Sequence, residues 1–519
     1  SSRCSAMPIG QLKNRYAVLS SARSAVLDRA RECAQVTIPF LYPLEGSTQT
    51  TKFPTPWQSF GARCVNNLSS KLILSQFPPN TPFFRLVVDD FARDALGASA
   101  GEVDEGLSKI ERTVMSTVET NAMRPALSEA LKHLVVSGNV MLYLSPKLKL
   151  RVFPLYQYVA KRDPEGHLLE GIVREVISPM EVPASVRSAV VEKARTAAAG
   201  SQRPSHQDAI ELYTGIERTP TGYRTWQECE GILLPDSLSS SPVDELRWMP
   251  LRWTTIDGED YGRGYVEQYL GDLKSLEALQ QAIVEGSAAA ARVLFLVRPN
   301  STTKKEVIAN APSGTVASGN ADDVSVVQME KYSDFRIARE VMNDLVQGLS
   351  YAFLLNTAVQ RQAERVTAEE IRYMVTELES SLGGVYATLS QELQLPFVSL
   401  LLSTLASQER LPKLPKGVAK PAITTGVEAL GRGNDANRMR TFLQSFAGLP
   451  EPVIERVFTK LNEEELIKRN AAAAQIDHTN LILSDEQVQE RQQQQMAQQA
   501  AVAAAPQVAR GAMEQAAAQ

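Results

Sequence analysis

The sequence is poor in the residues that most often build metal and catalytic sites. Only four of its 519 residues are cysteine, and only four are histidine. The cysteines form no C-x-x-C pair and have no histidine at ligand spacing, which argues against a zinc site. We expect the cysteines to be reduced thiols and the histidines to be structural or exposed. These residues are Cys4, Cys33, Cys64, Cys229, His133, His167, His206 and His478.

Long apolar runs and common nucleotide-binding motifs are also missing. No run of about eighteen apolar residues occurs, so we expect no membrane span. Residues 1–10 contain no apolar segment of signal-peptide length, which favours a soluble, intracellular product. The G-x-x-x-x-G-K-[ST] phosphate loop is absent, which argues against a nucleotide-driven motor, and neither H-E-x-x-H nor G-x-S-x-G occurs. The sequence predicts no cofactor, no bound metal and no enzymatic activity.

An excess of positive charge is absent as well, because the formal net charge is −5. Tight binding of nucleic acid depends mainly on neutralising phosphates, so this charge argues against sequence-specific DNA recognition. The same charge suits a conduit through which DNA slides, because a lining that leaves phosphates unneutralised creates no deep energy wells. Charge alone does not distinguish a conduit from a protein indifferent to DNA.

The length and composition indicate a globular chain with more than one module. A single hydrophobic core rarely serves 519 residues, and the 44% hydrophobic and 22% charged content is ordinary. The first half has a mixed α/β pattern; in its first helix the apolar residues share one face and the arginines lie elsewhere. Helices are predicted at 11–36, 60–74, 102–120 and 124–137, and strands at 140–144, 148–153, 209–213, 223–229 and 246–254.

The second half begins with one helical pattern over residues 266–294. Its later part is almost all small residues, from Gly286 through Ala291, which lets another helix approach closely. That helix could belong to another subunit or to the same chain, and the residues alone favour neither. Short strands follow at 294–297, 314–317 and 324–329, and helical spacing resumes at 333–355.

A long helix with an internal bend is predicted next. Thr367 and Glu370 form a T-x-x-E capping box, which places a helix start near residue 367. The pair Gly383-Gly384 predicts a bend, and Pro396 is expected to close the apolar stripe. The stripe consists of Ile371, Val375, Leu378, Leu382, Val385, Leu389 and Leu393.

Several long blocks, in one order, resemble the head-to-tail connector, or portal protein, of autographivirus-type short-tailed podoviruses. They cover most of residues 11–440, and the best block is 364–396, with its Leu-Gly-Gly-Val-Tyr and Ser-Gln-Glu-Leu-Gln-Leu-Pro segments. The other blocks are 55–58, 61–63, 66–68, 103–108, 138–140, 256–262 and 269–273.

The resemblance implies an α+β, mainly helical portal fold with a wing, stem, clip and crown, assembled as a ring around a central channel. By resemblance the ring is a dodecamer. The implied parts are a wing at 1–265, stem helices at 266–294 and 332–354, a clip at 295–331, a tunnel loop at 355–366, a long bent helix returning to the wing at 367–433, a crown at 434–486 and a low-complexity Ala/Gln-rich tail at 487–519.

Candidate site residues follow from these parts. The tunnel loop of the family points into the channel, so Arg361 and Arg365 would form a collar that touches phosphates without reading bases. An ion pair of Arg361 with Glu364, or with an acid of a neighbouring subunit, is the alternative. Gln360 and Gln362 belong to the same loop. Lys304 and Lys305 in the clip are expected to dock partners, although an ordinary exposed loop also explains them. The resemblance favours subunit packing for Gly286, Ala288, Ala289 and Ala290.

The function implied is a portal subunit at one capsid vertex of the virion, made in the host cytoplasm. Its implied partners are other copies of itself, double-stranded DNA bound without sequence preference, the terminase, tail adaptor and nozzle proteins, the major capsid protein, scaffold and internal core proteins. Two rival readings are a metal-dependent DNA-processing enzyme that uses scattered acids and a noncatalytic capsid or scaffolding component.

Overall fold

The structure is a computed structural model, and it divides the chain into two compact units. Unit 1 comprises Ser1–Arg85, Thr113–Leu411 and Ile423–Val427, and unit 2 comprises Leu86–Arg112, Pro412–Ala422 and Glu428–Gln519. The residues that the structure describes are 7–47, 50–79, 83–87, 100–199, 209–290, 294–301, 303–310, 312, 316, 318–327, 332–355, 368–411, 422–425 and 441–446.

The largest described sheet of unit 1 is antiparallel and has the strand order β4-β5-β6-β7-β8, with β9 paired to β7. The sequence predicted the strands near 209–213 and 223–229 but not the two before them. A helix lies on each face of this sheet. The elements are α1 (Leu12–Gln35), β4 (Tyr158–Arg162), β5 (Leu168–Ile177), α6 (Ala184–Ala199), β6 (Ile210–Thr219), β7 (Gly222–Cys229), β8 (Ile232–Leu233) and β9 (Ser239–Ser241).

The two helices bury opposite faces of the strands. Leu12 of α1 belongs to a buried cluster with Tyr213 of β6. Val190 of α6 belongs to another cluster with Leu212 of the same strand. Neighbouring residues of a strand point to opposite faces, so Leu212 and Tyr213 place α6 and α1 on opposite sides of the sheet.

One detail of α1 differs from the prediction that its arginines lie away from the apolar face. Arg23 is buried, with 2% of its surface exposed. Its guanidinium donates to the backbone carbonyls of Leu155 and Tyr158, and it lies over the ring of Tyr16. The carbonyls satisfy the buried charge, which is why an arginine can take a core position here.

A second layer of unit 1 combines a three-stranded sheet with helices α2 and α5. The strand order is β10-β2-β3, all antiparallel, and the β2–β3 pair confirms the predicted strands near 140–153. Helix α5 contacts α2, β2 and β3. The elements are α2 (Phe60–Gln76), α5 (Met123–Ser137), β2 (Asn139–Leu144), β3 (Leu150–Pro154) and β10 (Trp248–Arg252).

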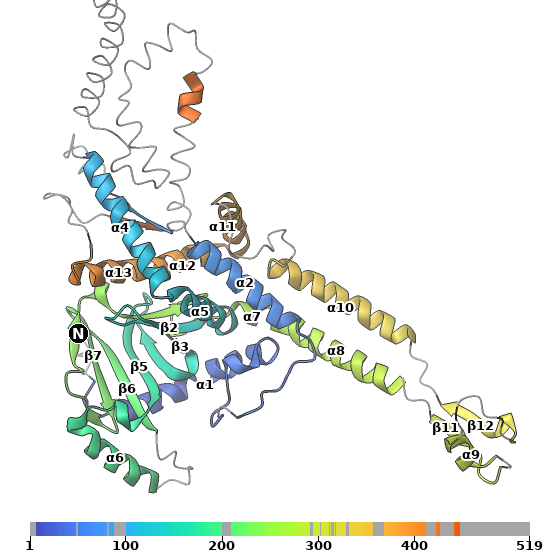
Figure 1. The fold of residues 1–519 in the computed structure, drawn as a ribbon. Helices are drawn as coiled ribbons and strands as arrows, with labels where there is room; N and C mark the ends of the chain where they lie inside the picture. Colours follow the sequence, from blue (N-terminus) through green and yellow to red (C-terminus); the bar gives the residue numbers. More distant parts are fainter. Residues whose placement is uncertain are drawn as a thin grey trace, which may run out of the picture. The chain divides into compact units, whose positions relative to one another are not determined.

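Next along the chain comes an antiparallel pair of long helices, α8 and α10, with a small insert between them (Figure 1). The predicted single helix over 266–294 is two helices, because α7 ends at Gln268 and α8 begins at Leu270. The insert holds the antiparallel strands β11 and β12 and a helix, α9, that was not predicted. The strand expected at 314–317 lies mostly outside the described residues. The elements are α7 (Tyr265–Gln268), α8 (Leu270–Ala290), β11 (Leu294–Val297), α9 (Lys305–Asn310), β12 (Val324–Val327) and α10 (Tyr332–Ala352).

The long helix is interrupted where the glycine pair predicted a bend. α11 (Ala368–Leu382) ends before Gly383, whose φ of 57° lies in the left-handed region, and α12 (Gly384–Leu389) starts after it. Pro396 does not close the helix, contrary to the prediction. It occupies the first turn of α13 (Leu395–Ser407), a position at which proline is common. A π-helical turn over Ser390–Gln394 joins α12 to α13.

The remaining described elements are short or cross the boundary between the units. α4 (Ala100–Thr120) confirms the helix predicted at 102–120. β1 (Phe84–Val87) pairs with β13 (Ala422–Thr425). Of the predicted crown, only a short helix at 441–446 is described, and the tail at 487–519 lies outside the described residues. Turns of 3-10 helix occur at Pro39–Leu41, Leu155–Gln157, Pro179–Glu181, Val243–Glu245 and Ala321–Asp323.

Candidate functional site

The helix pair α8 and α10 meets at a glycine. A Cβ atom added to Gly286 of α8 would lie 2.6 Å from Cε1 and from Cζ of Phe335 on α10. The absence of a side chain at Gly286 therefore lets the ring of Phe335 fit against α8. This contact within one chain accounts for one of the small residues that the sequence analysis assigned to subunit packing. Ala288 and Ala289 are exposed, and Ala290 is half-buried.

The pair is fixed at its base by aromatic rings. Tyr265, Tyr269 and Phe353 have mutual ring-centroid distances of 5.1 to 5.4 Å, and Trp253 lies 5.7 Å from Tyr265. The Tyr265 hydroxyl donates to the carbonyl of Ala352, at 2.8 Å. Edge-on aromatic contacts add to the burial of these rings, so the ends of the two helices are held to each other and to the chain after β10.

Polar contacts attach the first turns of α8 to α1 and to the segment before α2. The carboxylate of Glu277 accepts the backbone N–H of Trp57 at 2.8 Å and that of Gln58 at 3.3 Å. The Lys274 ammonium donates to Glu32 of α1 at 3.0 Å. Leu273 and Leu276, in the same stretch of the helix, are buried. The base of α8 is thus anchored, whereas its later residues are largely exposed.

The end of α10 is anchored by two side chains of α2. Asn67 Nδ2 donates to the carbonyls of Phe353 (2.9 Å) and Leu354 (3.1 Å), and Lys71 Nζ donates to the latter at 2.8 Å. These bonds satisfy carbonyls that a helix end leaves without partners. Lys71 also lies 3.5 Å from Glu377 of α11. Burial lowers the pKa of Lys71, and the carboxylate of Glu377 opposes that shift.

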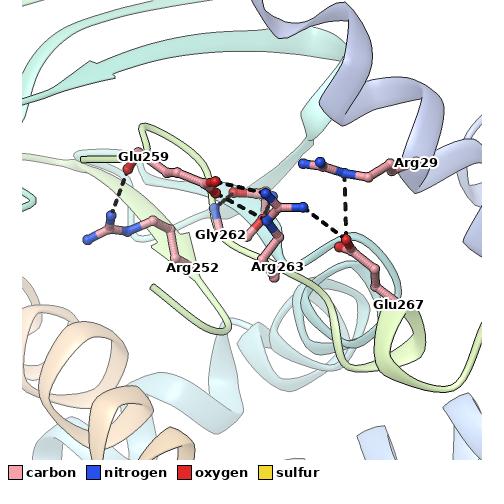
Figure 2. A network of polar contacts seen from close by, with 7 residues as sticks. Arg29, Arg252, Glu259, Gly262, Arg263 and Glu267 are labelled. Atoms are coloured by element: carbon pink, nitrogen blue, oxygen red, sulfur yellow. Dashed lines mark hydrogen bonds and ion pairs between the residues drawn. The ribbon is translucent and has the colours of Figure 1, made fainter. Parts of the chain in front are cut away.

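A charged network connects β10, the loop that follows it, α1 and α7 (Figure 2). Arg263 donates from Nε and Nη2 to the two carboxylate oxygens of Glu259, at 3.1 and 2.8 Å, and from Nη1 to Glu267 at 3.0 Å. Arg29 of α1 approaches Glu267 to 3.7 Å, and Arg252 Nη1 donates to the backbone carbonyl of Glu259. The hydrogen bond from Arg263 lowers the pKa of Glu259, and the same bond raises the pKa of Arg263.

The loop that carries Glu259 and Arg263 is also held through its backbone. Asn139 accepts the N–H of Gly262 at Oδ1 (2.7 Å) and donates from Nδ2 to its carbonyl (2.9 Å). A Cβ on Gly138 would lie 2.3 Å from the carbonyl carbon of Arg263, so the two backbones touch. Residues 256–264, which include the block at 256–262 that carried the resemblance, therefore form a joint that contacts β2 and leads into α7.

A second group of contacts ties this joint to the large sheet. The backbone N–H of Arg162 donates to Asp260 at 2.6 Å, and its guanidinium donates to the carbonyls of Asp260, Gly166 and Pro250. Burial lowers the pKa of Arg162, and nearby Arg252 lowers it further. The Tyr261 hydroxyl accepts the N–H of Ala160 at 3.0 Å.

The insert between the long helices is organised around Thr303, which is 8% exposed. Its hydroxyl accepts the N–H of Asn320 at 2.9 Å and donates to Asp323 at 3.2 Å. The adjacent Lys304 and Lys305 are exposed, and the ammonium of the second lies 3.9 Å from Glu306 in a solvent-exposed pair. Both predicted docking lysines are therefore accessible in this chain.

The four predicted channel residues lie outside the described residues. These residues are Gln360, Arg361, Gln362 and Arg365. The structure does define the residues on either side of the segment that contains them. Leu354 (φ 56°) is held by Asn67 and Lys71, and α11 begins at Ala368. Both anchoring side chains were missed by the sequence analysis, because they lie on a helix some 280 residues earlier.

The cysteines fit their expected roles in the described part of the chain. Cys33, Cys64 and Cys229 are free and buried, and burial raises the pKa of each thiol to about 12. Cys4 lies outside the described residues. Such thiols stay protonated and unreactive at neutral pH.

The structure brings together one set of groups that the sequence did not predict. Among the described residues, ligand atoms of Asp163, Glu165 and His167 lie within 4.8 Å of one another on the β4–β5 turn. Asp163 Oδ2 already accepts a hydrogen bond from Arg218 at 2.8 Å. A cation there would compete with that guanidinium, and we assign no metal to the turn.

No helix in the described part of the chain combines the length and apolar character needed to span a bilayer.

Comparison with known proteins confirms the resemblance seen in the sequence. Residues 10–482 match the family described as "Bacteriophage head to tail connecting protein". Similar curated proteins include portal proteins of Escherichia phage T7, Enterobacteria phage T3 and Enterobacteria phage SP6. The first is 40% identical over 98% of this chain and 94% of its own length. The T3 protein is 41% identical over 92% of this chain and 89% of its own length. The SP6 protein is 31% identical over 83% of this chain and 82% of its own length.

Among solved structures, the neck of an empty GTA particle, computed with C6 symmetry, is 11% identical with a TM-score of 0.36, covering 78% of this chain and 90% of that chain. The match to the family over most of the sequence, together with the near full-length identity to these phage proteins, shows that the chain belongs to the bacteriophage head to tail connecting protein family.

Proposed function

We propose that this chain is a phage portal subunit that assembles into a closed ring, a dodecamer by resemblance, at one vertex of the capsid. The observation that carries this proposal is the 40% identity to the portal protein of Escherichia phage T7 over 98% of the chain. The antiparallel helix pair with a distal insert supports it, because such a pair can line a passage while its base stays fixed in a larger body.

The parts of the ring follow the chain. The two sheets with α1, α2, α5 and α6 belong to the wing, 1–265. Helices α8 and α10 lie in the stem segments, 266–294 and 332–354, and β11, α9 and β12 lie in the clip, 295–331. The tunnel loop is 355–366, the interrupted helix lies in 367–433, and the crown is 434–486. The joint at Glu259 and Arg263 would keep wing and stem at a fixed angle.

In this proposal the ring acts by geometry and makes no bonds. Double-stranded DNA passes through the channel during packaging and ejection. The terminase docks on the clip first, and the tail adaptor and nozzle proteins dock there later. The remaining surface contacts the capsid, scaffold and internal core proteins. The exposed Lys304 and Lys305 are candidates for clip docking. Energy for translocation would come from the terminase, since the chain has no phosphate-binding loop.

Negative-stain electron microscopy of the purified protein tests the proposal. Rings with a central channel, together with no hydrolysis of ATP or DNA, are expected. A monomer that cuts DNA with added magnesium would instead identify the metal-dependent enzyme, and closed shells without rings would identify a capsid or scaffolding component.

A further inference from the structure

Helix α2 contacts both helices that border the predicted tunnel loop, α10 and α11 (Figure 1). Asn67 and Lys71 lie one turn apart on α2, so they share one side of the helix. Both donate to the carbonyl of Leu354, the residue just before the loop. The lysine also lies close to Glu377 of α11, the helix that follows the loop. The segments on either side of 355–366 are therefore held at one helix.

Lys71 is the residue common to both sides of the loop. It is 5% exposed, and its Nζ donates to the Leu354 carbonyl at 2.8 Å and lies 3.5 Å from the carboxylate of Glu377. The side chain of Glu377 is 16% exposed. Salt screens a pair that is this well shielded from water much less than a surface pair. The contact should therefore persist at ionic strengths that weaken surface ion pairs.

Packing alone does not require a charge at position 71. A buried ammonium costs free energy unless it is paired, and replacing a buried ion pair by apolar residues of similar size often leaves stability unchanged. Helix α11 already buries Met374, Val375 and Leu378. Such apolar burial is non-directional, whereas a hydrogen bond has a defined length and direction. The charge therefore sets where α11 lies relative to the end of α10.

The two predicted channel arginines belong to the segment that these contacts bound. Arg361 is seven residues after Leu354 and seven before Ala368, where α11 begins. Seven residues span at most about 25 Å, so both ends limit equally where Arg361 can lie. A shift of either end changes the region that this arginine can reach.

We propose that Lys71 is a positioning residue for the predicted channel arginines. It holds Leu354 and Glu377 at one point of α2 and thereby fixes both ends of the segment that carries Arg361 and Arg365. This inference rests on the proposed function. In a ring the same restraint acts in every copy, so the arginines of all copies are kept at one height along the axis.

Retention of packaged DNA measures this role in assembled particles. Lys71→Met keeps the length of the side chain and removes its charge. Asn67 still holds the end of α10 in this variant, so rings should form in normal yield. The fraction of DNA-filled particles after a salt challenge should fall severalfold. The matched control is Lys149→Met, which should retain DNA as the wild type does, because Lys149 is exposed on the turn between β2 and β3.

Combination with the arginine variant distinguishes positioning from a general structural role. If Lys71 acts through Arg361 and Arg365, Lys71→Met should cause no further loss of retention in particles that already carry Arg361→Ala with Arg365→Ala. A weakened ring or shell would instead add its own loss to that of the arginines. Additive losses, or normal retention in Lys71→Met alone, would overturn the inference.

Glu377→Gln is a second variant, which decides the question if Lys71→Met yields no rings. It keeps the shape of Glu377, leaves the ammonium bonded to Leu354 and removes only the charge on α11. Retention should fall in this variant and should not fall further in the arginine background. Normal retention in Glu377→Gln, or in Arg361→Ala with Arg365→Ala, would show that Lys71 does not act by positioning these arginines. A wild type that forms no rings would overturn the proposed function itself.

Discussion

Buried polar residues illustrate how much at the residue scale depends on distant parts of the chain. Glu170 lies in β5 with 8% of its surface exposed, and its carboxylate accepts two hydrogen bonds of 2.6 Å from Arg15 of α1. The sequence around Glu170 does not indicate that its partner is Arg15, which lies 155 residues away. A buried glutamate and the neighbouring Gly171 break the apolar alternation, which is why β5 was not predicted as a strand.

His133 gives a prediction for pH dependence. It is 2% exposed on α5, and burial lowers its pKa to about 4. Glu129 lies 4.0 Å away, but it is 59% exposed and solvent weakens its attraction. An unfolded histidine titrates near pH 6.5. Between about pH 6.5 and pH 4 the unfolded state therefore binds a proton that the folded state does not, and the free energy of unfolding falls by up to roughly 3 kcal/mol as pH decreases.

Urea unfolding at several pH values measures this effect. His133→Gln should have a shallower loss of stability than the wild type between pH 6.5 and pH 4, whatever its stability at pH 8. Parallel curves for the two proteins across this window would show that His133 is not held neutral by the fold.

Gly286 gives a second prediction at this scale. Gly286→Ala places a methyl group 2.6 Å from the Phe335 ring, whereas Gly348→Ala on α10 meets no atom within 4 Å. Both substitutions replace a helical glycine by alanine. This replacement by itself raises the free energy of unfolding by up to about 1 kcal/mol. The free energy of unfolding of Gly286→Ala should be lower than that of Gly348→Ala by about 1–3 kcal/mol, because the ring must move. Thermal unfolding compares them, and equal stabilities would mean that the two helices do not meet at this glycine.

At the scale of elements, helices with one clear apolar face were predicted best. The helices predicted at 60–74 and 333–355 match α2 and α10 closely. The sequence did not predict that Pro396 lies inside the helical segment, because a proline can either end a helix or occupy the first turn of the next. The π-helical turn before Pro396 joins the two helices without a loop.

The interruption at Gly383 gives the prediction for this scale. Its φ of 57° and ψ of −131° form a conformation that side chains strongly disfavour, whereas Gly384 begins α12 with no atom within 4 Å of an added Cβ. Gly383→Ala should be less stable to unfolding than Gly384→Ala by about 1–3 kcal/mol. Circular dichroism during thermal unfolding provides the measurement. If the two variants melt at the same temperature, α11 can continue into α12 without the break.

At the scale of the whole molecule, the family was readable from the sequence, whereas the contacts that organise the proposed site were not. The blocks at 256–262 and 364–396 identified the family, but their spacing does not reveal that Arg263 bridges Glu259 and Glu267. Nor does it reveal that Lys71 contacts both the end of α10 and α11. These contacts depend on how distant segments pack, so they follow from the fold and not from any local pattern.

The role of the predicted channel residues can be tested separately from ring assembly. Arg361→Ala combined with Arg365→Ala removes two positive charges per copy from the segment between Leu354 and Ala368, and a ring repeats that loss in every subunit. The anchors on α2 and the contact of Gly286 with Phe335 involve neither arginine, so rings should form in normal yield by electron microscopy. If these arginines form a phosphate-binding collar, packaged DNA should be retained less well, as measured by the fraction of DNA-filled particles after a salt challenge. The control Lys147→Ala with Lys149→Ala removes the same charge from the exposed turn between β2 and β3 and should leave the retention of packaged DNA unchanged. Normal retention in the Arg361 and Arg365 variant would show that the arginines serve ion pairs within or between subunits instead.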